Sequence, residues 1–120
     1  MPHLTNLLKA LADPARLRIV SLLHQHEELC VCEIMGALAL PQYAVSRNLS
    51  ILKAAGLVTD WRQGKWMHYS LEPALAEADK AVLKAVCVRA EIEPSTRQDL
   101  RRLAGHIRPR EDGEVVCCER

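Results

Sequence analysis

Apolar residues recur every three or four positions through the first half of the chain, which is the spacing of amphipathic helices. Asp13 followed by Pro14 is typical of a helix start, because aspartate caps the first turn and proline fits the first helical position. Gly56 is typical of a helix end. The pattern predicts four helices, over residues 4–11, from 14 to a polar stretch at 24–28, over about 30–38, and over 41–55.

After Gly56 the apolar period changes from helical to alternating, which is typical of strands. Residues 57–61 and 65–71 are predicted to form a hairpin joined by residues 62–64. The side chains of the second strand divide between one face with Met67, Tyr69 and Leu71 and another with Trp66, His68 and Ser70.

A helical period returns over residues 74–92 and stops at Pro94, because proline cannot continue a helix. A further short helix is predicted from Ser95, which with Gln98 resembles a capping box, to Gly105. The residues that follow are charged, and we expect them to be loosely structured.

Two short helices with a tight turn between them, followed by a hairpin, have the order of a winged helix-turn-helix. The 120 residues suffice for one modest core, built from Leu, Val, Ile and Ala because aromatic residues make up only 3% of the chain. We therefore predict a mainly α fold with a small β-hairpin (α+β), in one winged helix-turn-helix domain over residues 1–94. Residues 95–120 are predicted to be a C-terminal tail with one short helix and then a flexible segment.

The predicted fourth helix carries side chains that can read DNA. Val45, Leu49 and Leu52 share its inner face by their spacing, which turns the polar side chains outward. Glutamine suits adenine, arginine suits guanine or phosphate, and serine suits either. The hairpin tip adds two cations for the phosphate backbone or the minor groove. The predicted DNA-binding residues are Gln42, Tyr43, Ser46, Arg47, Ser50, Arg62 and Lys65.

The overall charge adds little to this hypothesis, because the formal net charge is only +1. No apolar run approaches the roughly 20 residues of a membrane span, and the start of the chain lacks a secretion signal. We therefore expect a cytoplasmic protein without membrane contact. Five cysteines in that reducing compartment indicate a ligand site or a redox site rather than a disulfide framework.

Cys30 and Cys32 are the candidate ion ligands, because paired thiolates attract soft ions such as As(III), Sb(III), Cd(II), Pb(II) and Zn(II). Residues two apart in a regular helix point roughly 160° away from each other, at about 100° per residue. Because both cysteines lie in the predicted third helix, one ion can bind both only by unwinding or distorting the start of that helix. This distortion would shift the fourth helix, so we expect ion binding to release DNA.

Four segments of the chain resemble, in the same order, the ArsR/SmtB family of metal- and metalloid-sensing repressors. They are ALADPARLRI at residues 10–19, ELCVCEI at 28–34, VSRNLSILKAAGLV at 45–58 and RQGKWMHY at 62–69. The resemblance covers roughly residues 4–90. It implies a homodimer built from the first and last helices of the domain, which binds an imperfect palindrome in double-stranded operator DNA and represses a resistance operon.

Arsenic-responsive members of that family carry a third cysteine three residues after the second, where this chain has Met35. A thioether cannot replace a thiolate as a strong As(III) ligand. The alternatives are two thiolates with water or hydroxide, or a third sulfur from Cys117 or Cys118, since some members carry cysteines in C-terminal tails. Cys87 is a weaker alternative, because a lone cysteine on an apolar stripe is usually a small buried hydrophobe.

The resemblance implies As(III) or Sb(III) as the inducer, with no organic cofactor. Zinc-sensing members use Asp and His ligands on the last helix, but residues 74–92 contain Asp79 and no His. Cadmium- and lead-sensing members add cysteines from an N-terminal arm, and residues 1–29 contain none. A Cd(II)/Pb(II)-responsive or thiol-redox-responsive repressor on the same fold is the alternative.

An enzyme is not expected, because the chain lacks a Cys-x-x-Cys pair, a glycine-rich phosphate loop and a nucleophile elbow. A winged-helix module that binds protein instead of DNA is a further alternative.

Overall fold

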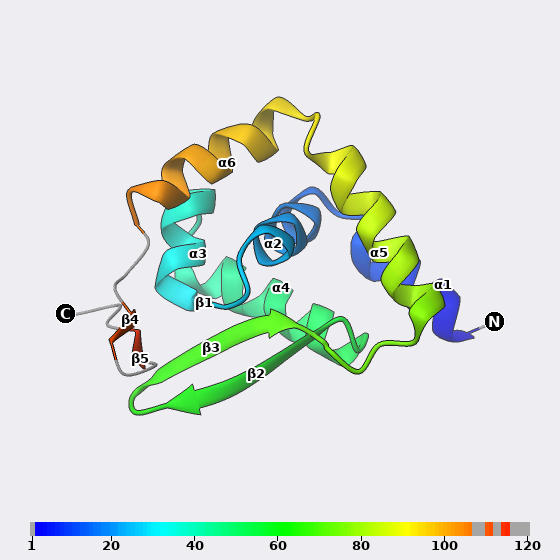
Figure 1. The fold of residues 1–120 in the computed structure, drawn as a ribbon, viewed down its shortest axis with the longest axis horizontal. Coiled ribbons are helices and arrows are strands. Elements are labelled where there is room, and N and C mark those ends of the chain that lie inside the picture. The colour runs from blue at the N-terminus through cyan, green and yellow to red at the C-terminus, as the bar shows by residue number, and fades with distance from the viewer. Residues whose placement is uncertain (1, 107–109, 112–113, 116–120) are drawn as a thin grey trace.

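The structure, a computed structural model, describes residues 2–106, 110–111 and 114–115. Its helices are α1 (Pro2–Leu11), α2 (Pro14–Gln25), α3 (Val31–Leu38), α4 (Gln42–Ala54), α5 (Glu77–Ala90) and α6 (Pro94–Ala104) (Figure 1). Its strands are β1 (Leu29–Cys30), β2 (Val58–Gln63), β3 (Trp66–Leu71), β4 (Arg110–Glu111) and β5 (Glu114–Val115). This order confirms the predicted mainly α fold with a β-hairpin.

Helix α2 lies at the centre of the fold, with α3, α4, α5 and α6 around it (Figure 1). Asp13 caps it as predicted, because its side chain accepts a hydrogen bond from the Arg16 backbone N–H at 3.1 Å and Pro14 takes the first helical position. Residues 19–23 are all buried. A helix that buries one stripe cannot bury five consecutive residues, so α2 is covered on nearly all sides.

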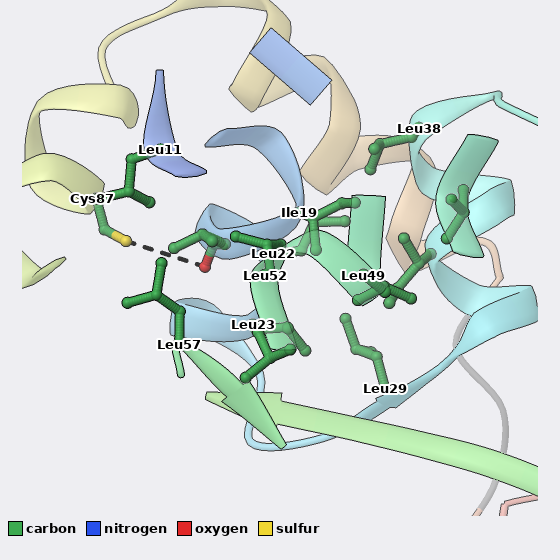
Figure 2. Close-up of a cluster of buried hydrophobic side chains, with 14 of the residues drawn as sticks. Leu11, Ile19, Leu22, Leu23, Leu29, Leu38, Leu49, Leu52, Leu57 and Cys87 are labelled. Carbon is green, nitrogen blue, oxygen red and sulfur yellow. Dashed lines mark hydrogen bonds between the residues drawn. The ribbon is translucent and has the colours of Figure 1, made fainter. Parts of the chain in front are cut away.

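The core is aliphatic, as the composition predicts. Figure 2 shows a buried cluster with side chains from α1 to α5. Its labelled members are Leu11, Ile19, Leu22, Leu23, Leu29, Leu38, Leu49, Leu52, Leu57 and Cys87. Burying one such leucine or isoleucine stabilises a fold by about 1.5–3 kcal/mol, so the cluster holds the helices in a fixed relation to one another.

The main sheet has three antiparallel strands in the order β1–β3–β2. Strands β2 and β3 form the predicted hairpin, but the turn is Gly64 and Lys65 instead of residues 62–64, because Gln63 still pairs with Trp66. Gly64 has a φ of 66°, which glycine readily adopts in a two-residue turn. The sequence pattern does not predict β1, since two residues are too few to show a period.

Helix α6 begins at Pro94 with Glu93 at the N-cap, so the prediction that Ser95 caps it is wrong. Proline suits the first helical position, and this preference decides the start. Gly105 is at the C-cap, as predicted. Helix α6 lies along α3 (Figure 1). Within the part of the chain that the structure describes, we find no helix with the length and apolarity that a bilayer crossing requires.

Candidate DNA-reading motif and thiol site

Helices α3 and α4 form the helix-turn-helix, with a turn of three residues between them. The first of these, Ala39, has a φ of 56° and a ψ of 44°, in the left-handed region. The Leu40 N–H donates to the Met35 carbonyl at 3.3 Å. A residue with a side chain in this region costs roughly 1–2 kcal/mol, so the contacts on either side of the turn must hold it there.

The inner face of α4 is the predicted one, because Val45, Leu49 and Leu52 are all buried. Asn48 is also buried on that face. Its Oδ1 accepts a hydrogen bond from Arg16 Nη1 at 3.1 Å, and its Nδ2 donates to the Ala44 carbonyl at 2.9 Å. A buried amide needs such partners, and the bond from Arg16 ties this face of α4 to α2.

The predicted DNA-reading side chains of α4 lie on its opposite face. Gln42, Arg47 and Ser50 are exposed, and Ser46 is half-buried. Tyr43 is the most open, with 73% of its surface exposed. This face therefore presents hydrogen-bond donors and acceptors to a binding partner.

The wing is the β2–β3 hairpin, and both of its predicted DNA-binding cations are exposed. Arg62 lies within β2 and Lys65 lies in the turn. Among the described residues, neither of these cations nor Arg47 takes part in an ion pair. Their charges are therefore available to an anionic partner such as a phosphate backbone.

The candidate ion ligands lie where β1 meets α3. Cys30 is fully buried and is the N-cap residue of α3, and its backbone N–H donates to Glu33 Oε1 at 3.0 Å. Cys32 is half-buried in the first turn of α3. Cys32 and Trp66 both pack against Cys30. We call these three residues the thiol cluster.

The prediction that Cys30 starts the third helix is wrong by one residue. Its φ of −92° and ψ of 167° are extended, because the residue pairs with His68 in the sheet before α3 begins. The 160° separation of a regular helix therefore does not apply to Cys30 and Cys32. Their side chains belong to one cluster, so the argument that an ion must unwind α3 loses its premise.

His68 also lies in this region. The sequence pattern places it on one face of the second hairpin strand but predicts no function for it. It is fully buried opposite Cys30, and its ring stacks on Trp61 with centroids 5.8 Å apart. Its Nδ1 lies 3.3 Å from Glu28 Oε2, in poor hydrogen-bonding geometry. Among the described residues, no three His, Cys, Asp or Glu side chains are placed to hold a metal ion.

The remaining cysteines divide into two groups. Cys117 and Cys118 lie outside the described residues. Cys87 is buried in α5, and its Sγ lies 3.9 Å from the Val20 carbonyl (Figure 2). Burial, and to a lesser degree the charge of Glu91, raise the pKa of the Cys87 thiol to about 12. This position fits the prediction that Cys87 is a small buried hydrophobe.

The chain has relatives of known class. Residues 13–60 match the family model for bacterial regulatory proteins of the arsR family. The chain is 51% identical over 67 residues to the arsenical resistance operon repressor of Escherichia coli, covering 56% of this chain and 57% of that protein. It is 44% identical over 78 residues to the arsenic resistance transcriptional regulator ArsR1 of Pseudomonas putida, covering 65% of this chain and 61% of that protein. The chain thus spans about three fifths of the length of these curated relatives.

Solved structures share the fold over most of their length. The transcriptional regulator HlyU of Vibrio vulnificus matches with a TM-score of 0.61 and 35% identity, over 74% of this chain and 86% of that one. The homodimeric winged helix-turn-helix domain Mb0332 of Mycobacterium bovis matches with a TM-score of 0.63 and 31% identity, over 78% of this chain and 82% of that one. The antimony-specific transcriptional repressor AntR matches with a TM-score of 0.60 and 27% identity, over 73% of this chain and 78% of that one. These likenesses confirm the winged helix-turn-helix prediction and the prediction that the chain is not an enzyme.

The buried Cys87 provides a test of this arrangement. A thiol with a pKa of about 12 is almost entirely protonated at pH 8, and only the thiolate reacts with a disulfide reagent. We expect Cys87, in a variant with the other four cysteines changed to serine, to resist Ellman's reagent in the folded protein and to react at once in denaturant. Rapid reaction without denaturant would contradict the burial of Cys87.

Proposed function

Because the chain belongs to the arsR family of bacterial regulatory proteins, we propose that it is a metalloid-responsive transcriptional repressor. A homodimer binds operator DNA through α4 and the β2–β3 wing, and it dissociates when Cys30 and Cys32 bind As(III) or Sb(III). It acts in the cytoplasm, where thiols stay reduced. The observation that carries this proposal is the position of the thiol cluster, which joins the start of α3 to the wing beside its turn.

The proposed DNA contacts follow from the exposed face of α4. A helix in the major groove places side chains such as Arg47 and Gln42 at base edges, while the wing places Arg62 and Lys65 at the phosphates or the minor groove. The partly buried bond between Arg16 and Asn48 holds that face outward. An imperfect palindrome suits a dimer, because two-fold symmetry in the protein presents the same helix to two half-sites.

The proposed coupling runs from the thiol cluster to both DNA-binding parts. Cys30 belongs to β1 and Cys32 to α3, while Trp66 lies beside Lys65 of the wing turn. An ion held by both sulfurs adds volume and new bonds where these three elements meet. It therefore changes the angle between α3 and the wing, and DNA affinity falls by as much as the ion prefers the changed arrangement.

We propose that Cys117 or Cys118 supplies the third sulfur where Met35 stands in place of a cysteine. Support comes from the path of the described chain. A Cβ on Gly36, one helical turn after Cys32, would lie 2.5 Å from the His106 ring, so α3 and the end of the α6 region are in close contact. Cys117 follows His106 by eleven positions, and the pairing of β4 with β5 turns part of this stretch back on itself, so its reach is shorter than that of a fully extended chain.

A second copy of the chain is the proposed partner of α1 and α5. Large apolar side chains on these helices are 38–50% exposed, at Leu4, Leu8 and Val88, and Ile92, just after α5, is 60% exposed. The two helices are tied to each other by the bond of His3 Nε2 with Asp79 Oδ2 at 2.8 Å. An apolar surface of this kind is typical of a homodimer interface, and the related domain Mb0332 is homodimeric.

The DNA contacts can be tested on a duplex that the parent protein selects from a random library. We expect Arg47→Ala to lower affinity about 10- to 100-fold and to relax base preference, since an arginine at a base edge contributes roughly 1–3 kcal/mol. Lys65→Ala is expected to reduce the salt slope by about one, the signature of a lost phosphate contact. Arg101→Ala removes the same charge from an exposed position of α6 and serves as the control. Equal affinity of Arg47→Ala and the control would argue against this orientation of α4.

The inducer can be tested by titrating the DNA complex with As(III), Sb(III), Cd(II), Pb(II), Zn(II) and peroxide at fixed salt. We expect As(III) or Sb(III) to release the parent, and the Cys30→Ser/Cys32→Ser variant to bind DNA and ignore both. The Cys117→Ser/Cys118→Ser variant is expected to respond only at higher As(III), because two thiolates remain. Cys87→Ser is the control and should respond like the parent.

Three outcomes would contradict that part of the proposal. Release of the Cys30→Ser/Cys32→Ser variant by arsenite would show that the site lies elsewhere. Release of the parent by peroxide alone would favour a thiol-redox switch, and release by Cd(II) or Pb(II) alone would favour a metal sensor.

The dimer can be tested by sedimentation. We expect Leu8→Glu/Val88→Glu to sediment as a monomer and to lose most of its affinity for a palindromic duplex, because a carboxylate in an apolar interface loses its hydration. Tyr43→Glu, which changes an exposed residue of α4, should leave the oligomeric state unchanged. A parent protein that is monomeric at all concentrations would overturn the proposed interface.

A further inference from the structure

Helix α6 carries a buried carboxylate, Asp99, which is only 1% exposed. Arg18 of α2 binds it with two charge-assisted bonds, from Nε to Oδ2 and from Nη2 to Oδ1, both at 2.8 Å. Arg102 adds a third, from Nη2 to Oδ1 at 3.0 Å. The hydrogen bond with Asp99 raises the pKa of Arg18. Two guanidinium groups therefore share one buried carboxylate, which fixes both of them in orientation.

The same two arginines reach the last turn of α3. Arg18 Nη2 donates to the Leu38 carbonyl at 2.9 Å, and Arg102 Nε donates to the Ala37 carbonyl at 2.8 Å. Carbonyls at a helix C-terminus lack partners within the helix, and positive charge there is favourable to the helix dipole. Asp99, Arg18 and Arg102, which we call the α6 clamp, therefore hold the end of α3.

The position of the α6 clamp is next to the helix-turn-helix turn. Leu38 is the last residue of α3, and Ala39 follows it in the left-handed region. The clamp adds to the close contact of Gly36 with His106, so α6 holds α3 over its second half. Both Asp99 and Arg102 lie outside residues 13–60, the segment that matches the family model.

We propose that α6 is a positioning element for DNA reading, in which Asp99 and Arg102 set the direction of α4 by holding the last carbonyls of α3. The inference rests on the proposed DNA-binding function. It gives residues 94–104 a role in operator affinity without contact with DNA. Arg102 and Asp99 are positioning residues, because they act through Ala37 and Leu38.

Neighbouring arginines on α6 provide a matched test. Arg101 is exposed, whereas Arg102 is half-buried and bound to Ala37 and Asp99. Arg101→Gln and Arg102→Gln remove the same charge one residue apart. We expect Arg102→Gln to bind the selected duplex about five-fold or more weakly than Arg101→Gln, which is the lower end of a typical coupling between sites. The salt slopes of the two variants should agree, because neither loses a phosphate contact.

A second readout separates positioning from general destabilisation. Binding is measured well below the melting temperature of each variant, and hydrogen exchange is followed at the amides of Ala39 and Leu40. We expect faster exchange at these two amides in Arg102→Gln, with exchange in the centre of α2 unchanged. If Arg102→Gln does not fold, Arg102→Lys with Arg101→Lys as control replaces the pair, since lysine keeps the charge but loses the planar fork.

The outcomes are distinct for this inference and for the proposed function. Equal affinity of the two folded variants, or unchanged exchange at Ala39 and Leu40, would overturn the positioning role of the α6 clamp. Failure of the parent protein to select any duplex would overturn DNA binding itself.

Discussion

The central position of α2 is the constraint on which the other elements depend. Its residues 19–23 are buried without interruption, so α3, α4, α5 and α6 must each cover part of its circumference. The leucines of these helices complete a single aliphatic cluster around it (Figure 2). An apolar helix cannot leave one side in water without losing about 25 cal/mol for each Å² exposed. The angle between α4 and the rest of the domain is therefore set by the filling of this core.

Strong local signals explain why much of this fold is predictable from sequence. Asp13 with Pro14, the inner stripe of α4 and the alternation of β3 each depend on neighbours in the chain, so they are readable without tertiary information. Strand β1 and the burial of His68 depend on a pairing across about forty residues, which no local period reveals. The docking of α6 is likewise hidden from local patterns, because its buried Asp99 binds Arg18, which lies far away in the sequence. The other partner of Asp99 is Arg102, one turn later on α6, which also binds a backbone carbonyl of α3.

The candidate site shows the same division. The spacing of Cys30 and Cys32 is visible in the sequence, and so are the outward side chains of α4. The one-residue difference in the start of α3 is not visible in the sequence, yet it decides how the two cysteines lie. Because Cys30 pairs in the sheet and Cys32 lies in the first turn of α3, the two side chains belong to two different elements. A pair within one helix would report only on that helix.

Ala39 has a consequence for the energetics of the turn between α3 and α4. Its left-handed backbone stores free energy of roughly 1–2 kcal/mol in the turn between α3 and α4, which corresponds to a factor of about ten in an equilibrium constant. The arrangement with α4 held in place is thus the higher-energy geometry of the turn itself, maintained by surrounding contacts. Those contacts must therefore contribute at least this much free energy to hold the turn in the folded domain.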